Sequence, residues 1–332
     1  MKKSILITGV AGFIGFSIAQ RLLKLNWQVF GIDNLNDYYS VNLKKKRISQ
    51  LKKISKKNFV FYKINIKNRN SLEKIFVINN FDIVLNLAAQ AGVRYSFVNP
   101  QSYIESNIIG FFNIIDLSRK YKIKHFIFAS TSSVYGNLKN YPLKEEYQTD
   151  SPIQLYAATK KSNEVIAHSY SAMYKLKVSG LRFFTVYGPW GRPDMALFNF
   201  TKRIIEKKKI NIFNHGNHAR DFTFIDDIVQ GIYNLIVLKK KISYKNKKIP
   251  YAIFNLAKGN KVKLMSFIKC IEKELKIKSK KIFLPIQVGD VNLTHGSIEK
   301  AKKNLNYFPT TDYKIGIKKF ITWYKYYYKK NT

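Results

Sequence analysis

The stretch ITGVAGFIG, residues 7–15, decides the fold expected for this chain. It places Gly9, Gly12 and Gly15 between a short β-branched run and an amphipathic segment, in the spacing GxxGxxG. A tight strand-to-helix turn needs residues without a Cβ, so that backbone N–H groups can approach a pyrophosphate at the start of a helix. Three glycines also fit a turn without a ligand, but their place between strand and helix favours dinucleotide binding, with Phe13 and Ile14 beside them.

Short apolar runs alternate with helical patterns outward from this turn. The expected strands are 4–8, 28–33, 59–64, 81–88, 125–130, 178–184 and 252–257, and the main expected helices are 13–25, 102–121 and 157–174. Near-continuous apolar strands that alternate with helices predict a parallel sheet covered on both faces. The fold class is therefore α/β, a doubly wound parallel (Rossmann) sheet with a smaller mixed α/β substrate-binding region.

The alternation loosens after about residue 185, where prolines begin to interrupt it. We expect residues 1–185 to form the dinucleotide-binding domain and residues 186–332 to form the substrate-binding region. Within the second part, residues 218–258 are expected to pack back onto the sheet.

Asp33 ends the second expected strand, 18 residues after Gly15. A carboxylate at this position accepts hydrogen bonds from a ribose diol and repels a 2′-phosphate. The sequence therefore predicts NAD rather than NADP, although Asp33 also fits a simple turn cap.

The composition limits the other possibilities. The formal net charge of +39 comes from lysines scattered over every segment without a nucleic-acid-binding motif, so we expect no specific nucleic-acid partner. No apolar run reaches the roughly 18–20 residues of a membrane span, which predicts no membrane insertion. Cys270 is the only cysteine and fits a packing position, which suits a cytoplasmic protein.

Tyr156 and Lys160 lie four residues apart in an expected helix and therefore share a face. A nearby ammonium stabilises phenolate, so Tyr156 could take a proton from an alcohol near neutral pH. Thr131 ends the fifth expected strand and can position the same alcohol. A Tyr-x-x-x-Lys pair is common by chance in this chain. Together with the glycine turn and the hydroxyl-rich strand end, however, it predicts a catalytic pair, and no metal is expected.

Together TGVAGFIG, LAAQAGVRYS, ASTSSVYG and YAATK resemble the extended short-chain dehydrogenase/reductase family of nucleotide-sugar enzymes, which includes NAD-dependent epimerases and dehydratases. The strings GIDNLNDYYSVNLKKKR, LRFFTVYGPWGRPDMA and RDFTFIDDIV are similar to those of its UDP-glucuronate 4-epimerases. This resemblance implies a tightly bound NAD that is regenerated in each cycle. It also implies reversible epimerisation of UDP-glucuronate to UDP-galacturonate through a 4-keto sugar, for surface polysaccharide precursors.

The resemblance also assigns roles to further residues. It implies Tyr156, Lys160 and Thr131 as the catalytic residues, and further cofactor contacts at Asn34, Leu87, Ala88, Ala89 and Asn107. It implies contacts with the sugar carboxylate from Ser132, Ser133, Thr185 and Arg192, with Arg94 as a further basic candidate. Arg192 also fits a salt bridge within its own turn, and the two serines fit strand-end hydrogen bonds. For the UDP part it implies Arg220 at the diphosphate, Asp290 at the ribose and Asn214 at the uracil.

Dehydratases and decarboxylases of this family typically place an acidic residue just after the catalytic threonine. This chain has Ser132 and Ser133 there, so neither dehydration nor decarboxylation of the sugar is expected. Two alternatives remain open. One is a 4-epimerase of a neutral or N-acetylated UDP-hexose, and the other is an NAD-binding module without turnover. The expected helices 102–121 and 157–174 carry apolar positions that could form a homodimer interface, as in the family, or could face the sheet.

Overall fold

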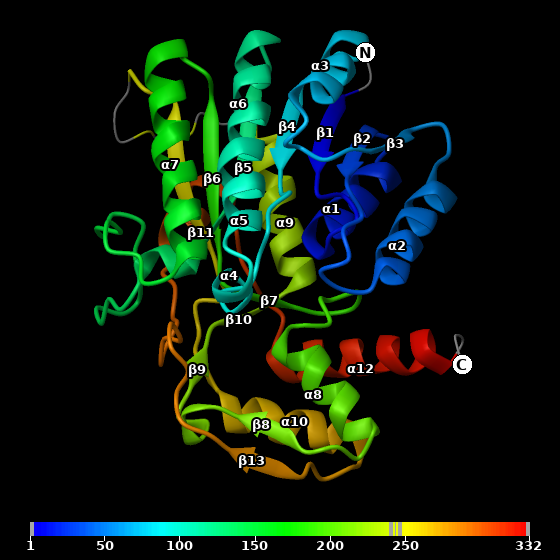
Figure 1. Ribbon diagram of the computed structural model, residues 1–332, viewed down its shortest axis with the longest axis vertical. Coiled ribbons are helices and arrows are strands. Elements are labelled where there is room, and N and C mark those ends of the chain that lie inside the picture. Colours follow the sequence, from blue (N-terminus) through cyan, green and yellow to red (C-terminus); the bar gives the residue numbers. More distant parts are fainter. Residues whose placement is uncertain (1–2, 239–241, 243, 245–247, 330–332) are drawn as a thin grey trace.

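A seven-stranded parallel sheet forms the upper part of the molecule (Figure 1). The computed structural model describes residues 3–238, 242, 244 and 248–329. The strand order is β11-β6-β5-β4-β1-β2-β3. The strands are β1 (Ser4–Thr8), β2 (Gln28–Asp33), β3 (Phe59–Lys63), β4 (Ile83–Asn86), β5 (His125–Thr131), β6 (Val178–Phe183) and β11 (Tyr251–Leu256). The expected doubly wound sheet is confirmed.

Helices cover both faces of the sheet, as the apolar strands require. On β1, the side chains of Ile5 and Ile7 join one buried cluster and that of Leu6 joins the other, because successive side chains of a strand point to opposite faces. The first cluster includes side chains of α1 (Phe13–Lys24), α2 (Val41–Ile54) and α9 (Ile225–Val237). The second includes those of α3 (Arg69–Ile78), α6 (Gly110–Lys120) and α7 (Leu155–Tyr174).

The expected helix 102–121 is divided in the structure. After the short α4 (Tyr95–Val98), it consists of α5 (Gln101–Tyr103), a π-helical segment (Ile104–Ile109) and α6. Such π-helical turns are rare inside helices and often lie at functional sites. Asn107, one of the expected cofactor contacts, lies within this segment.

The strand order reverses between β1 and β4, since the chain builds outward in both directions from this pair. The carboxyl ends of the parallel strands meet at one edge of the sheet, where Thr8, Asp33, Asn86 and Thr131 end their strands. Ligands of open α/β sheets bind in the crevice outside such a reversal. The fold therefore places the glycine turn and Thr131 at the edge where a dinucleotide is expected.

The lower part of the molecule lies beyond this edge (Figure 1). It contains three two-stranded sheets and several helices. The sheets pair β7 (Thr185–Tyr187) with β10 (Phe222–Phe224), β9 (Ala219–Arg220) with β12 (Val262–Lys263), and β8 (Ile210–Ile212) with β13 (Lys281–Phe283). The helices of the lower part are α8 (Ala196–Ile205), α10 (Leu264–Leu275) and α12 (Tyr313–Lys329), with a short 3₁₀ turn at Asn214–Gly216. Helix α11 (Glu299–Leu305) instead packs against β11 and α9 of the upper part, and a 3₁₀ turn at Ser132–Tyr135 follows β5.

Two segments of the range 218–258 lie against the upper part. β11 pairs with β6 as the outermost strand of the large sheet, and α9 contributes to the same buried cluster as α1. Residues 239–241, 243 and 245–247 of this range lie outside the described residues. The division at residue 185 stays a prediction.

Within the described part of the chain, no helix is both long and apolar enough to cross a membrane. Cys270 lies half-buried in α10 and packs against the core of the lower part.

Candidate active site

A cavity of about 430 Å³ opens at the carboxyl edge of the large sheet. This volume lies in the range of typical small-molecule sites. The cavity collects most of the residues predicted from the sequence. Those that line it are Gly9, Gly12, Phe13, Ile14, Gly15, Asp33, Asn34, Leu87, Ala88, Ala89, Thr131, Ser132, Ser133, Tyr156, Lys160, Thr185 and Arg192.

The glycine turn has the geometry of a phosphate cradle. Gly9 adopts φ +71°, and a Cβ built on it would lie 2.8 Å from the backbone nitrogen of Ala88. A Cβ on Gly12 would lie 2.9 Å from the carbonyl oxygen of Gly9, and one on Gly15 would overlap that same oxygen. Helix α1 begins directly after Gly12, so its first N–H groups, which have no partner within the helix, are available to an anion. The turn therefore fits a dinucleotide diphosphate.

Asp33 is linked to the glycine turn as well as to its own loop. One carboxylate oxygen accepts a hydrogen bond from the backbone N–H of Ala11 at 3.0 Å, and the other accepts one from Leu35 at 2.8 Å. Burial raises the pKa of the Asp33 carboxyl, while these hydrogen bonds and the charge of Lys44 act in the opposite direction. The turn-cap role is therefore observed, and the carboxylate still lines the cavity where a ribose is expected.

Tyr156 and Lys160 both reach the cavity from the first turns of α7. Burial raises the pKa of the Tyr156 phenol, whereas the charge of Arg192 and a hydrogen bond with Thr131 lower it. For the protein chain alone, loss of hydration outweighs these two contributions, so further positive charge is needed to bring the pKa of the phenol below its ordinary value. Burial also lowers the pKa of Lys160 to about 8, opposed by the charge of Glu164.

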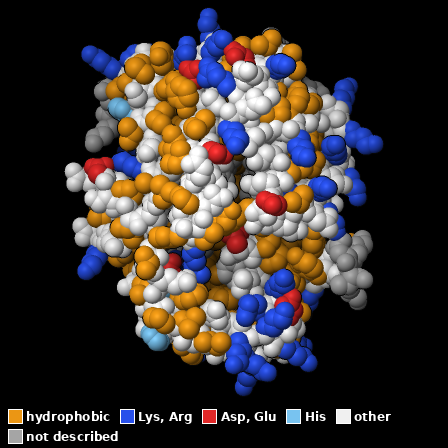
Figure 2. Space-filling view, in the orientation of Figure 1, with side chains coloured by type: hydrophobic (Ala, Val, Ile, Leu, Met, Phe, Trp, Pro, Cys, Tyr) orange, Lys and Arg blue, Asp and Glu red, His pale blue; other side chains and the backbone are white. Residues whose placement is uncertain are grey.

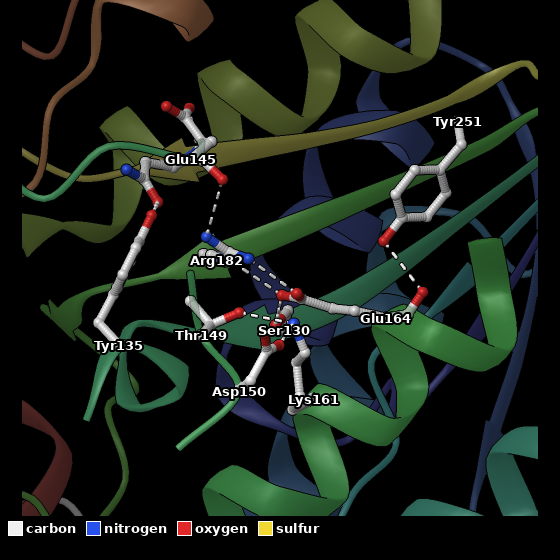
Figure 3. A network of polar contacts seen from close by, with 10 residues as sticks. Ser130, Tyr135, Glu145, Thr149, Asp150, Lys161, Glu164, Arg182 and Tyr251 are labelled. Carbon is white, nitrogen blue, oxygen red and sulfur yellow. Dashed lines mark hydrogen bonds and ion pairs between the residues drawn. The ribbon is translucent and has the colours of Figure 1, made fainter. Parts of the chain in front are cut away.

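A polar network joins α7 to the neighbouring strands β5 and β6 (Figure 3). Glu164, one turn after Lys160, accepts hydrogen bonds from Ser130 at 2.6 Å and from the Arg182 guanidinium at 2.8 and 2.9 Å. The Arg182 and Glu164 side chains are only 4% and 5% exposed, so this is a buried ion pair. Since Ser130 directly precedes Thr131, the network joins α7, which carries Tyr156 and Lys160, to the strand end that carries Thr131.

The same network continues away from the cavity. Arg182 also donates to the carbonyl of Glu145, and its guanidinium lies 4.7 Å from the ring of Tyr135. On α7, Lys161, which directly follows Lys160, donates to Thr149 at 2.8 Å and pairs with Asp150 at 2.9 Å. These contacts hold the loop that leads into α7 (Figure 3).

Hydroxyl groups surround the end of the cavity near Tyr156. The Thr131 hydroxyl accepts a hydrogen bond from the backbone N–H of Ser133 at 3.2 Å and lies 3.3 Å from its hydroxyl. Thr185 starts β7, and its backbone N–H donates to the carbonyl of Asp221 at 3.1 Å. Ser133 thus meets the strand end through its backbone N–H and its hydroxyl, both at the Thr131 hydroxyl.

Arg192 lines the cavity and also forms the salt bridge that its turn suggested. Its Nε and Nη2 donate to the two carboxylate oxygens of Asp194 at 3.1 and 2.5 Å. Tyr38 donates to the same carboxylate at 3.2 Å. A guanidinium has five N–H donors, so this fork occupies one edge and leaves the other for a second carboxylate.

The four remaining substrate candidates form a separate cluster beside the cavity. Arg94 pairs with Asp290 at 3.2 Å. Asn214 donates to the side chain of Asn292 at 3.1 Å, and Arg220 donates to the carbonyl of Asn292 at 3.0 Å. Burial lowers the pKa of Arg220, which favours an anionic neighbour. The structure thus brings Arg94, Asn214, Arg220 and Asp290 together, outside the lining of the main cavity.

Asn107 does not line the cavity. Its side chain accepts from the backbone N–H of Gln90 at 2.8 Å and donates to the Gln90 carbonyl and the Thr159 hydroxyl, both at 3.0 Å. Gln90 itself lines the cavity, so Asn107 shapes the loop after β4.

Sequence reasoning missed several residues of the site. Lys44, Asn36 and Tyr38 line the cavity, and Lys44 donates to the carbonyl of Asn36 at 2.7 Å. All three lie in the string GIDNLNDYYSVNLKKKR, which carried the family resemblance, but only its first Asp-Asn pair was assigned. Tyr103 was also missed, and its ring packs edge-on against Tyr156 at 6.1 Å.

These relations define a class of protein. A glycine turn heads a doubly wound sheet, and a tyrosine–lysine pair faces the same crevice from α7, as in NAD-dependent short-chain dehydrogenases and reductases. The sequence pattern of the NAD dependent epimerase/dehydratase family matches residues 5–264. The chain belongs to this family, and the expected NAD-dependent nucleotide-sugar epimerase is confirmed.

Relatives and solved structures support this placement. The chain is 47% identical to Protein CapI of Staphylococcus aureus, over 98% of this chain and 99% of the relative. It is 44% identical to UDP-glucuronate 4-epimerase 4 of Arabidopsis thaliana, over 98% of this chain and 76% of the relative. A crystal structure of UDP-glucuronic acid 4-epimerase from Bacillus cereus, in complex with UDP-glucuronic acid and NAD, superposes with a TM-score of 0.89. That protein is 33% identical, with 98% and 100% of the two chains covered.

Proposed function

We propose that the protein interconverts UDP-glucuronate and UDP-galacturonate by inverting C4 of the sugar, and that its product supplies surface polysaccharides. The observation that carries this proposal is the position of Arg192. Its guanidinium lines the same cavity as Tyr156, Lys160 and a group of hydroxyls, so a sugar carboxylate could be bound beside the reacting carbon. The names of the Arabidopsis and Bacillus relatives support the same substrate.

Tyr156 would act as the general base for the 4-hydroxyl group. Thr131 interacts with the phenol, so its hydroxyl is placed to hydrogen-bond the same sugar oxygen. Because burial raises the pKa of the phenol, deprotonation needs positive charge nearby. The charge of Arg192 already acts on the phenol in this direction, and Lys160, which lines the same cavity one turn after Tyr156, would add to it.

NAD, bound along the glycine turn, supplies the hydride acceptor and donor and is expected to stay bound through the cycle. The turn would hold its diphosphate and Asp33 its adenine ribose. The residues of this chain thus contribute orientation and proton transfer at the sugar.

The carboxylate must be held firmly because the 4-keto sugar is a β-keto acid. Such an acid loses CO₂ when the breaking C–C bond lies perpendicular to the carbonyl plane. Arg192 together with Ser132, Ser133 and Thr185 would keep the carboxylate away from that orientation. The UDP part is assigned to the cluster of Arg94, Asn214, Arg220 and Asp290, where Arg220 would meet the diphosphate.

The decisive experiment offers purified protein UDP-glucuronate, UDP-glucose and UDP-N-acetylglucosamine in parallel, without added cofactor. We expect UDP-galacturonate as the product of the first, identified by anion-exchange chromatography and NMR. Turnover of a neutral sugar but not of UDP-glucuronate would show that the proposed substrate is wrong. A pentose product would show that the carboxylate is lost as CO₂, which contradicts the proposed carboxylate clamp. A protein that binds NAD but turns over none of the three would be the non-catalytic module.

We also propose that the protein forms a homodimer through α6 and α7. Apolar side chains on the outer side of these helices and of the π-helical segment are exposed, and Val165 and Met173 are 58% and 59% exposed. Figure 2 shows hydrophobic side chains spread over this face, with lysine and arginine mostly at its rim. A second copy would cover both helices. The cytoplasmic location expected from the sequence stays a prediction.

A further inference from the structure

Arg47 is a fully buried cation with only uncharged hydrogen-bond partners. It lies in α2, is 0% exposed, and is the largest side chain buried to this degree in the described residues. Its Nη1 donates to the Ala11 carbonyl at 2.7 Å and to the Tyr39 hydroxyl at 2.8 Å. Its Nη2 donates to the carbonyls of Trp190 and Gly191 at 2.5 and 3.2 Å. Within the described part of the chain, no acidic side chain pairs with it and its Nε has no hydrogen-bond partner.

This arrangement is costly for folding alone. Taking an ion out of water without a counter-charge is unfavourable, and hydrogen bonds to uncharged groups offset this only in part. The charged groups around Arg47 do not remove this cost. Lys44 on the same helix adds a second positive charge. Asp33 on β2 interacts with Arg47 electrostatically, but its carboxylate oxygens are already bonded to the N–H groups of Ala11 and Leu35.

The carbonyl groups that Arg47 binds come from two functional segments. Ala11 belongs to the glycine turn that fits a diphosphate, whereas Trp190 and Gly191 directly precede Arg192. Arg47 is therefore a rigid connection between the cofactor turn and the turn that presents the proposed carboxylate clamp.

The second of these turns is strained. Trp190 adopts φ +62°, a left-handed conformation that large side chains rarely take. Such conformations persist only where the surroundings over-determine them, and they concentrate at functional sites. Here the indole packs between Phe16 and Trp323 with ring centres at 5.3 and 5.4 Å, and Arg47 fixes its carbonyl.

We propose that Arg47 is a positioning residue that couples cofactor binding to the placement of Arg192. Its buried charge favours a diphosphate at the start of α1, and its fork of hydrogen bonds holds the strained turn in register with that diphosphate. The charge and the fork are separable, because lysine keeps the charge and loses the fork. The role of Arg192 in this inference rests on the proposed function, whereas the role of the charge does not.

The test compares Arg47→Lys and Arg47→Met, with Lys52→Met as the matched control, since Lys52 is an exposed cation of the same helix. Three quantities are measured: NAD retained after dialysis, the rise in Tm on adding NAD, and KM and kcat for the UDP-sugar turned over. For Arg47→Met we expect NAD affinity to fall roughly ten- to thirty-fold, with a smaller NAD-induced rise in Tm. For Arg47→Lys we expect NAD retention close to that of the wild type, but a KM about tenfold higher.

Two results would overturn the inference. One is NAD retention and KM equal to the wild type in both folded variants, which would make Arg47 a structural residue only. The other is the same loss of NAD in Lys52→Met, which would make the effect one of total charge. If Arg47→Met does not fold, Arg47→Lys alone still decides the role of the fork. If the wild type turns over no UDP-sugar, the proposed function fails, and the NAD measurements still decide the role of the charge.

Discussion

Replacing Glu164 by glutamine is expected to lower the stability of the protein sharply, because it leaves Arg182 buried without its counter-charge. The Glu164 and Arg182 side chains are 5% and 4% exposed and are joined by hydrogen bonds of 2.8 and 2.9 Å (Figure 3). Removing one partner of a buried pair costs about 3–5 kcal/mol. For a chain of this size that corresponds to a fall in Tm of roughly 4–7 °C.

The double variant Glu164→Gln/Arg182→Met separates the charge from the packing. It removes both charges together, so we expect it to be clearly more stable than Glu164→Gln and than Arg182→Met alone. In a double-mutant cycle from thermal and urea unfolding, the coupling energy should be about 2–4 kcal/mol. A double variant whose loss equals the sum of the single losses would refute the view that the pair acts as a unit.

The same substitution should change the pH profile of the enzyme. The charge of Glu164 raises the pKa of Lys160, which burial lowers to about 8. Without that carboxylate, Lys160 loses its proton at lower pH and, in the proposed mechanism, would no longer supply positive charge to the Tyr156 phenolate. We expect the alkaline fall in kcat/KM to move down by about 1 pH unit, on the order of the Coulomb energy of two groups one helical turn apart. An unchanged alkaline limb would show that Glu164 acts on stability alone.

Three further outcomes are expected. Lys160→Met should abolish epimerisation but raise Tm at pH 7. The reason is that the Lys160 pKa of about 8 lies below the unfolded value of about 10.4, so its cost is complete below pH 8 and fades as the pH rises toward 10; a lower Tm at pH 7 would contradict this. Tyr156→Phe should retain NAD but reduce turnover at least about a hundredfold, as measured by product NMR, and near-wild-type turnover would remove Tyr156 as the base. The double variant Phe112→Glu/Val165→Glu should be a monomer in light scattering where the wild type is a dimer, since both side chains are exposed on the proposed interface. A wild-type protein that is itself monomeric would contradict the proposed dimer.

The sequence predicted the sheet well because its signal is local. Each expected strand is a short apolar run, and all seven join one parallel sheet with ends shifted by at most two residues. The glycine turn was readable for the same reason, since the need for a missing Cβ is set within nine residues. The π-helical segment inside 102–121 was not readable, because its apolar pattern continues that of the helices on either side.

The sequence by itself predicted which residues meet in the cavity, since Tyr156, Lys160, Thr131 and the glycine turn were identified from residue type and from their place at strand and helix ends. Only the tertiary structure decided how their charges are balanced. The Glu164–Arg182 pair beside Lys160 arises from the contact between α7 and β6. Arg47 is 143 residues from Trp190 in the sequence. The residues next to either position therefore do not indicate that Arg47 is buried between two turns. Burial and charge pairing set pKa values, and both exist only once distant segments exclude water from each other.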